Sequence, residues 1–527
     1  MAFLTLPMIQ WTPDGWRIVW FSESDRGWGE TGADPDHLTH QPSAVSVLTR
    51  VAEGLELPVP RRIHRHEVPI DDIDGEIVWH RAGINTAEGA VTTELTQARR
   101  PSPDGGPILL TSDHQAMPLT AFATTAMSQV LDEPVEAVFY AGDCVNVPDR
   151  ASEWFDLPSG NSFFQCLQGT AQGGDGDAAW PGSAILQHCP IYTTIGNHEV
   201  MGRVTGRNLD VAFNEPVPRE VALAEFERVE GRRPTTPDDH RHVENDSWSI
   251  RTYQQVFGLE SASDGWYSTR VGNVWLISLF ATRAWRPVES TLDPNARLSN
   301  SRYHDAAGTQ NRPLERGYGS FPFVEIGKGS RQYEWLVEQL AAPERQACRW
   351  TVVMLHEGPF GTGDNVMPPW SEPEHTVEHD GDGNRVGTRY QYHQQRNPLL
   401  TDLVPLFDEA GVNLVLSGHS HVWNRFRTDA GVNYLETSNV GNTYGSTEVA
   451  LVRALPTAPW LHDDYLAAGS PAGMAPVPST HGDITAIADD HSSVFSYLDT
   501  RTGLVRTWHA SPSCGTTVLD EFSLGAG

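Results

Sequence analysis

The stretch that decides the fold is Ile191-Tyr192-Thr193-Thr194-Ile195-Gly196-Asn197-His198-Glu199. Its first five residues predict a short buried strand, and its last four place a glycine, an amide, an imidazole and a carboxylate where that strand ends. Polar groups follow apolar runs in the same way at four other places: Ser112-Asp113-His114-Gln115, Gly142-Asp143, His356 and Gly418-His419-Ser420-His421. Because ligands collect just past the carboxyl ends of strands in open α/β sheets, these five segments predict one shared site.

The chain from residue 106 to residue 527 has the pattern of an α/β layered domain, because short apolar runs alternate with stretches of helical spacing. Strands are expected at 108–111, 137–141, 191–195, 274–280, 350–355 and 413–417, and helices at 119–131, 331–340 and 399–410. A hairpin is expected at 493–509. The polar stretches at about 200–265, 285–330 and 455–490 are expected to be loop-rich insertions, and the first two to help shape a substrate cleft.

Residues 1–105 are expected to form a separate all-β unit. Its strand candidates are 16–21, 77–82 and 90–95, and turn residues separate them at short intervals, as in a sandwich. The proline- and glycine-rich segment 99–107 is expected to link the two units.

Composition excludes several classes of protein. The chain of 527 residues has a net charge of −31, which disfavours binding to nucleic acid or to anionic lipid. No apolar stretch is long enough to span a membrane. The first residues lack the pattern of a secretory signal, so a cytoplasmic location is favoured, and a processed exported form is left open. The five cysteines form no CxxC pair and are expected to be free buried thiols, with a Cys166–Cys189 pair possible only after export.

The residue types at the five segments suit a pair of metal ions. Carboxylate and amide oxygens mixed with imidazole nitrogens favour Zn, Mn or Fe over Ca. One carboxylate can bridge two metals about 3.5–4 Å apart, and Asp143 is the best bridge candidate. Two cations would also supply the local positive charge that an anionic phosphate ester needs on so acidic a chain.

The five segments, taken in order, resemble the motifs of the calcineurin-like metallophosphoesterases, and more closely those of the branch that contains the purple acid phosphatases. The resemblance implies a two-sheet β-sandwich flanked by helices, preceded by a small fibronectin-like domain. It implies one metal held by Asp113, Asp143, His421 and, as a further ligand, Gln115. It implies a second metal held by Asp143, Asn197, His356 and His419. His198 would contact the phosphoryl group or protonate the leaving group, and Glu199 would tune the pKa of His198.

Three positions depart from that branch. Gln115 stands where a histidine is common, so His114 remains an alternative for the first metal. Asn146 replaces the tyrosine that gives the purple enzymes their colour, so a colourless protein is expected. Val366 replaces a second histidine, whose place could be supplied by His375, His379 or His393.

The sequence thus predicts a hydrolase of small-molecule phosphate esters with two divalent or trivalent metal ions, Fe, Zn or Mn. A phosphomonoesterase that uses metal-bound hydroxide as the nucleophile is the leading hypothesis. A phosphodiesterase acting on a cyclic nucleotide or a glycerophosphodiester is the alternative. A non-catalytic metal-containing binding protein is a third hypothesis. Both enzyme hypotheses depend on bound metal ions, which would supply the activated water. The oligomeric state is left open.

Overall fold

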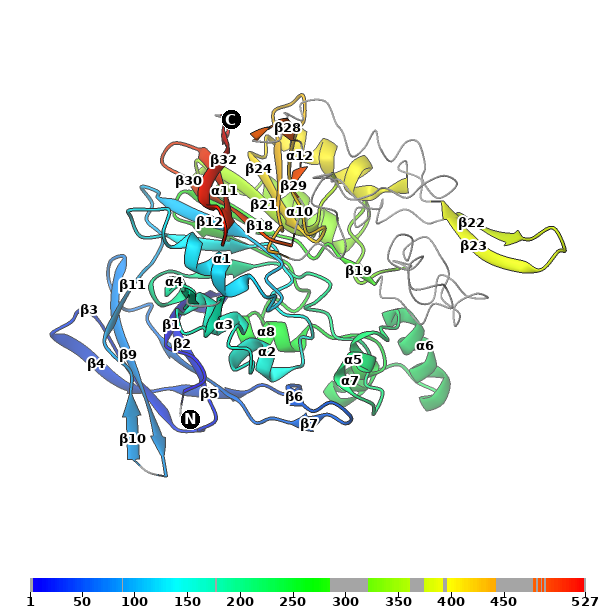
Figure 1. Ribbon diagram of the computed structural model, residues 1–527. Helices are drawn as coiled ribbons and strands as arrows, with labels where there is room; N and C mark the ends of the chain where they lie inside the picture. The colour runs from blue at the N-terminus through cyan, green and yellow to red at the C-terminus, as the bar shows by residue number, and fades with distance from the viewer. Residues whose placement is uncertain are drawn as a thin grey trace.

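The computed structural model describes residues 3–525 except 88, 176–177, 285–320, 361–373, 392–395, 442–476, 480–481, 485 and 488–489. The N-terminal unit is all β, as expected from the sequence, and lies at the lower left of Figure 1. One of its sheets has the order β1-β2-β8-β5, and the other runs β10-β9-β3-β4 with β11 also paired to β9. Its strands are β1 Met8–Thr12, β2 Gly15–Ser22, β3 Gly27–Asp34, β4 His37–Pro42, β5 Ala44–Val47, β6 Ala52–Glu53, β7 Val59–Pro60, β8 His64–Pro69, β9 Ile77–Thr86, β10 Gly89–Thr92 and β11 Thr96–Arg99.

The larger unit contains two main sheets, which makes the predicted fold class correct. The first sheet has the order β16-β13-β12-β30-β31-β32, in which β12, β13 and β16 are parallel and the three C-terminal strands are antiparallel. Its strands are β12 Pro107–Thr111, β13 Ala137–Tyr140, β16 Ile191–Thr193, β30 Ser493–Asp499, β31 Leu504–Ser511 and β32 Gly515–Ser523. The expected hairpin is β30–β31, whereas β32 was not predicted.

The second sheet has the order β17-β18-β21-β24-β26-β25-β29, with parallel pairing from β18 to β21, β24 and β26. Its strands are β17 Tyr267–Val271, β18 Val274–Ser278, β21 Trp350–Glu357, β24 Leu414–Gly418, β25 Trp423–Arg427, β26 Asn433–Thr437 and β29 Ala486–Ile487. Short two-stranded pairs complete the β structure: β14 Gly173–Asp175, β15 Ala178–Trp180, β19 Arg283–Ala284, β20 Phe321–Pro322, β22 Glu374–His379, β23 Arg385–Gln391, β27 Val477–Ser479 and β28 Gly482–Ile484. The β22–β23 hairpin projects to the right in Figure 1.

The second sheet is buried on both faces, which explains its continuous apolar runs. Along β21, Val352 and Met354 belong to the core between the sheets, whereas Val353 and Leu355 belong to a core on the outer face. The alternation is the period of two that a strand imposes on its side chains. Helices α10 (Arg331–Leu340) and α12 (Val404–Ala410) contribute to the outer core. The predicted helix at 399–410 is a π-helical turn, Leu399–Leu403, followed by α12.

The prediction that residues 200–265 are loop-rich was wrong, because this stretch contains four helices. They are α5 Leu209–Phe213, α6 Arg219–Glu230, α7 Pro237–Asn245 and α8 Arg251–Phe257, and α5–α7 lie at the lower right of Figure 1. The remaining helices are α1 Thr120–Met127, α2 Ala151–Phe155, α3 Phe163–Leu167, α4 Ile185–His188 and α11 Pro343–Gln346. Most of the predicted insertions at 285–330 and 455–490 lie outside the described residues, as do Val366 and His393.

The N-terminal unit packs against the larger unit through its own apolar residues. Phe21 of β2 lies 5.0 Å from Phe155 and 5.6 Å from Phe164, ring centroid to ring centroid. Arg61 donates two hydrogen bonds of 2.6 Å to the Asp156 carboxylate. One side of the N-terminal unit therefore joins the core of the larger unit, and the N-terminal unit also has a separate core of its own.

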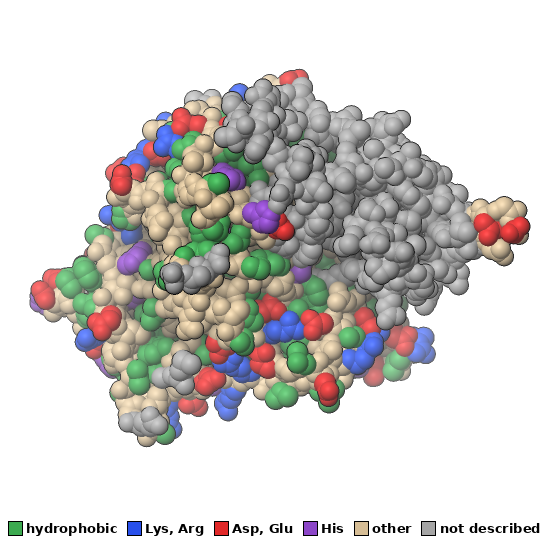
Figure 2. All heavy atoms as spheres, viewed as in Figure 1, with side chains coloured by type: hydrophobic (Ala, Val, Ile, Leu, Met, Phe, Trp, Pro, Cys, Tyr) green, Lys and Arg blue, Asp and Glu red, His purple; other side chains and the backbone are tan. Residues whose placement is uncertain are grey.

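The surface and the cysteines fit the composition. Acidic and arginine side chains are interspersed along the lower edge of Figure 2, in the area of α6 and α7. In the described part of the chain, no helix is both long and apolar enough to cross a membrane. All five cysteines are free as expected, and Cys144, Cys166 and Cys189 are buried, but the prediction of burial was wrong for Cys348, which is partly exposed, and for Cys514, which is exposed. Because burial raises the pKa of each of the three buried thiols, they remain protonated and inert at neutral pH.

Candidate metal centre

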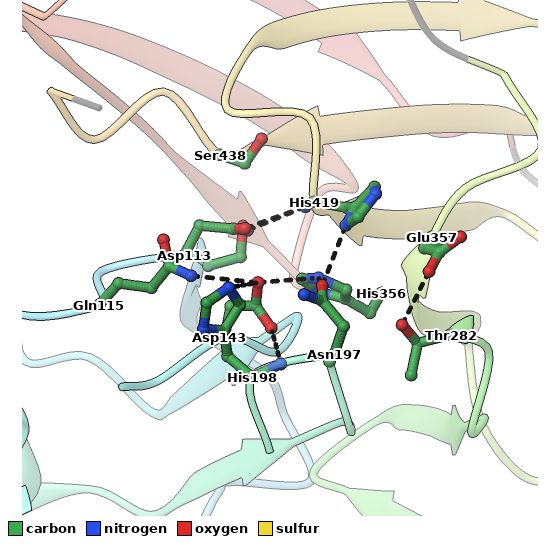
Figure 3. Close-up of polar contacts among 12 residues, drawn as sticks. Asp113, Gln115, Asp143, Asn197, His198, Thr282, His356, Glu357, His419 and Ser438 are labelled. Atoms are coloured by element: carbon green, nitrogen blue, oxygen red, sulfur yellow. Dashed lines mark hydrogen bonds and ion pairs between the residues drawn. The ribbon is translucent and has the colours of Figure 1, made fainter. Parts of the chain in front are cut away.

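The predicted site residues meet where the carboxyl ends of the two large sheets come together (Figure 3). Asp113 and Asp143 follow β12 and β13 of the first sheet, and Asn197 follows β16. His356 lies within β21 of the second sheet, and His419 and His421 follow β24. The side chains are far apart in sequence, and the strand order alone brings them together.

Two groups of side chains have the arrangement of a metal site. One group is Asp143, His356 and His419, and the other is Asp113, Asp143 and His421. Within each group the ligand atoms lie within 4.8 Å of one another, and all are buried. Asp143 belongs to both groups, which is the position of a carboxylate that bridges two ions.

Asn197 and Gln115 complete the two groups. The Asn197 Oδ1 atom lies 3.2 Å from His356 Nε2 and 3.2 Å from His419 Nδ1. Gln115 Nε2 donates to Asp143 Oδ2 at 3.3 Å. On the other side of the site, His421 Nε2 lies 3.4 Å from Asp113 Oδ1. Asn197 therefore lies beside the two histidines of the second group, and Gln115 lies beside Asp143, which belongs to both groups.

The ligand atoms around His356 are arranged to bind a cation rather than to hydrogen-bond only with one another. His356 Nδ1 donates to the Ala141 carbonyl at 2.7 Å, which directs the Nε2 atom toward the site. That Nε2 atom faces two acceptors, Asp143 Oδ2 and Asn197 Oδ1, each at 3.2 Å. Burial lowers the pKa of His356, but the Asp143 and Asp113 carboxylates more than reverse this and raise the pKa to about 10. The arrangement therefore attracts positive charge, and the residues present fit a metal ion.

The backbone is strained at the predicted ligands. Among the described residues, six that are not glycine have positive φ, and five of them are predicted ligands: Asp113, Gln115, Asp143, His419 and His421. This conformation is costly for residues that have a Cβ atom and is typical of functional sites.

The glycines of the motifs are required by close approach. A Cβ atom on Gly196 would lie 2.2 Å from Asp143 Oδ1, and one on Gly418 would lie 2.3 Å from Asp113 Oδ2. A Cβ atom on Gly142, where φ is +92°, would lie 2.6 Å from His356 Nδ1. Each glycine therefore leaves room for the side chain of a predicted ligand.

His198 lies at the rim of the site and is only partly buried. Its Nδ1 atom is held by the main-chain carbonyl of Asn146 at 2.7 Å, and its Nε2 atom lies 4.0 Å from Asp143 Oδ2. Its main-chain N–H donates to Asp143 Oδ1 at 2.9 Å. The Asn146 carbonyl, which sequence reasoning did not assign to the site, thus fixes which nitrogen of His198 faces inward.

The Glu199 carboxylate, which the resemblance implies would tune the pKa of His198, binds main-chain N–H groups. It accepts the main-chain N–H groups of Asp143, Cys144 and Gly196 at 2.7–2.8 Å, and it is fully buried. Burial and the nearby Asp143 charge raise the pKa of Glu199, and the N–H donors oppose that rise. Because its oxygens are used by the backbone, Glu199 holds together the loops that carry Asp143 and Asn197.

Glu436 holds a ligand loop in the second sheet, as Glu199 does in the first, and it was not identified from the sequence. It is buried on β26 and accepts the main-chain N–H of Ser420 at 2.7 Å and the Ser438 hydroxyl at 2.9 Å. Ser420 stands between His419 and His421, so Glu436 fixes the loop that carries both rings. Burial raises the pKa of Glu436 to about 7. A lone glutamate within a strand gave no signal in the sequence.

His114 is turned away from the predicted ligands. Its Nε2 atom lies 2.9 Å from the Thr111 hydroxyl, and its ring packs edge-on against Tyr140 at 5.1 Å. Burial lowers the pKa of His114 to about 3, so it is a neutral core residue. Of the two alternatives for the first metal, only Gln115 lies beside Asp143. Of the histidines that could replace the second histidine, His379 is exposed, and the side chains of His375 and His393 lie outside the described part of the structure.

Comparison with known proteins agrees with this geometry. A family model described as calcineurin-like phosphoesterase matches residues 106–423, more than half of the chain. Purple acid phosphatase 18 of Arabidopsis thaliana is 23% identical over 103 residues, which are 20% of this chain and only 18% of that protein. The solved structure of purple acid phosphatase PPD1 from yellow lupin (Lupinus luteus) seeds matches with a TM-score of 0.51 at 14% identity, over 98% of this chain and 73% of that chain. The structural match confirms the predicted fold.

Proposed function

The chain belongs to the calcineurin-like phosphoesterase family, and on this basis we propose that it is a metal-dependent phosphomonoesterase acting on small molecules. The observation that carries the proposal is the sharing of Asp143 between two buried groups of ligands. Asp113, Gln115, Asp143 and His421 would hold one ion, and Asp143, Asn197, His356 and His419 the other. When bound, two such ions activate water for attack on phosphorus and neutralise charge on the phosphoryl oxygens.

The neutral ligands matter for that chemistry. Asn197 and the three histidines contribute no negative charge when they bind a cation, so the two carboxylates would leave at least half of the positive charge of two ions uncompensated. A phosphate ester is an anion and would be attracted to this residual charge. The centre thereby overcomes the repulsion expected from a chain with a net charge of −31.

His198 is proposed to protonate the leaving group. Its Nδ1 atom is held by the Asn146 carbonyl, which leaves Nε2 directed toward the site. In the protonated ring Nε2 is a donor, and it can pass its proton to the oxygen that leaves phosphorus. His198 is less buried than the predicted ligands, so solvent can return the proton after each turnover.

A monoester is preferred over a diester because both relatives are named as purple acid phosphatases. The preference is tested by measuring hydrolysis of p-nitrophenyl phosphate and bis(p-nitrophenyl) phosphate side by side, with Mn, Zn or Fe added to metal-stripped protein. We expect a higher kcat/KM on the monoester. A higher value on the diester would reverse the assignment. Failure to hydrolyse either ester with any of the three metals would support the non-catalytic binding hypothesis.

The assignment of His198 has its own test. His198→Ala should keep two metals per chain and lose about 100-fold or more in kcat, which is typical of removing a general acid. The loss should be larger on phenyl phosphate than on p-nitrophenyl phosphate, because nitrophenolate leaves without needing a proton. The exposed His37 of the N-terminal unit offers a matched control, and His37→Ala should change nothing. Equal losses on both esters, or loss of a metal, would contradict the role.

A further inference from the structure

A large cavity lies apart from the candidate ligands. It has a volume of about 900 Å³ and is lined by residues of α6, α7 and α8 and by parts of the segments 263–266 and 323–332. None of the predicted metal ligands lines it. Its volume is within the range of about 300–1,000 Å³ that is usual for small-molecule sites. The cavity is large enough for an organic ligand, and the metal centre does not account for it.

Four arginines and four carboxylates line the cavity, the carboxylates being Glu227, Glu244, Asp264 and Glu325, and three of the arginines are paired with carboxylates. Arg331 pairs with Asp264 at 2.7 Å, and Arg233 pairs with Glu227 at 3.4 Å. Arg251 pairs with Glu244. These three guanidinium groups are compensated by carboxylates on the same wall, so they require no ligand.

Arg219 is different. Its guanidinium lies 4.0 Å over the Trp248 ring and donates one hydrogen bond, of 2.6 Å, to the Ser247 hydroxyl. No described carboxylate lies within ion-pair distance of it. Burial lowers the pKa of Arg219 to about 10, so the group remains charged at neutral pH although it is poorly solvated. A cation held in this way, with donors to spare and beside a cavity, is what an anion-binding site requires.

The residues that line the cavity indicate which chemical group is attached to the anion. Trp248 and Trp266 both line the cavity and offer flat apolar surfaces, and Gln254 adds a polar group. Trp248 is held in place by edge-on contacts with Phe280 at 5.9 Å and Phe323 at 5.5 Å. Arginine stacked on an aromatic ring binds carboxylates and phosphates well, because the guanidinium keeps its donor edge free. We propose that this cavity is a second binding site, which takes a phosphate or carboxylate group attached to a ring.

The site is connected to the metal centre through the backbone. Ser249, next to Trp248, exchanges two main-chain hydrogen bonds with Met201, at 2.8 and 2.9 Å. Met201 is three residues beyond His198. The wall that holds the anion is therefore fastened to the segment that follows the candidate general acid, although the two sites share no residue.

The proposal is tested by titrating phenylphosphonate into metal-stripped full-length protein, followed by calorimetry and tryptophan fluorescence. Stripping the metals removes the other attraction for the anion, so the outcome does not depend on whether the protein hydrolyses phosphate esters. We expect one site with fluorescence quenching. Benzoate, tested in parallel, distinguishes a site for either oxyanion from one selective for phosphonate.

Variants then locate the site. Arg219→Gln should weaken phenylphosphonate binding at least 10-fold, and Arg219→Lys should weaken it less. Arg233→Gln is the matched control, because Arg233 lines the same cavity but is exposed and paired. Trp248→Phe should keep binding and reduce the quenching, which shows that the cavity and not a surface patch is occupied. The proposal is overturned if wild-type protein shows no binding up to about 10 mM, which corresponds to less than about 3 kcal/mol. It is also overturned if a folded Arg219→Gln protein binds as tightly as the wild type.

Discussion

Substitution of Gly418 by alanine tests whether the ligand geometry, and not merely the ligand residues, makes the metal centre. The new Cβ atom would lie 2.3 Å from Asp113 Oδ2 and 2.8 Å from the Ser112 hydroxyl. An ordinary contact needs about 3.5 Å, so the carboxylate or the loop after β24 must move by roughly 1 Å. Asp113 cannot move freely, because both of its oxygens accept the His419 N–H at 3.1 Å.

The size of the effect follows from that displacement. Metal–ligand distances tolerate changes of only about 0.2 Å, so a shift of roughly 1 Å removes a ligand from its ion. If the loop after β24 moves instead, it carries His419 and His421 with it. Overpacking itself costs about 1–3 kcal/mol of stability. We therefore expect Gly418→Ala to remain folded, to lose at least one metal per chain, and to lose about 100-fold in kcat.

The assay combines elemental analysis of metal-reconstituted protein with hydrolysis of p-nitrophenyl phosphate. Gly381→Ala is the control, because a Cβ atom on Gly381 meets nothing within 4 Å and its φ is not positive. It should leave metal content and rate unchanged. A Gly418→Ala protein with two metals per chain and the wild-type rate would refute the argument that Asp113 must hold its present position.

Three further predictions follow from the same structure. Glu436→Gln replaces one acceptor oxygen in the clamp on Ser420, so metal affinity measured by calorimetry should fall about 10–100-fold; unchanged affinity would exclude a positioning role. Burial lowers the pKa of His80 from 6.5 to about 4, so stability is lost as pH falls from 6.5 toward 4. At pH 5 the loss is about 2 kcal/mol, and thermal melts of His80→Gln should show a smaller drop between pH 7 and pH 5 than the wild type; an equal drop would contradict this. Removal of metal with a chelator should lower the melting temperature, and added Mn²⁺ or Zn²⁺ should restore it, whereas no change would mean that the centre binds no ion.

The central parallel strands were predictable, whereas β32 and the helices of the insertion were not. Strands β12, β13, β16, β18, β21 and β24 are buried along their whole length, so they stand out as continuous apolar runs in the sequence, whereas β32 is mostly exposed. In α6 only Ala222 and Phe226 are buried, which leaves too little apolar periodicity to detect. The available signals were at the helix ends: Gly231 in the left-handed conformation after α6, and Thr236 with Asp239 in a capping box before α7.

At the candidate site, too, some residues could be predicted from the sequence and others could not. Asp143 and His419 could be named from the sequence because they directly follow apolar runs and glycines. The roles of Glu199 and Glu436 could not be predicted, because they depend on main-chain N–H groups that the fold brings close to these carboxylates. A carboxylate that binds backbone has no spacing rule in the sequence. Glu199 was noticed only because it is adjacent to His198, and its bonds to main-chain N–H groups were not predicted from the sequence.

The cost of building this centre argues that it serves a purpose. Five predicted ligands have positive φ, at about 1–3 kcal/mol each, and the sum is comparable to the net stability of a typical domain. The glycines that give the ligands room also lose more conformational entropy on folding than other residues do. Such costs persist only where other interactions determine the conformation, and here Glu199 and Glu436 hold the two sets of loops from opposite sheets. A structural role alone would be satisfied by relaxed loops, so the strain is best explained by selection for the positions that these side chains need in order to bind metal.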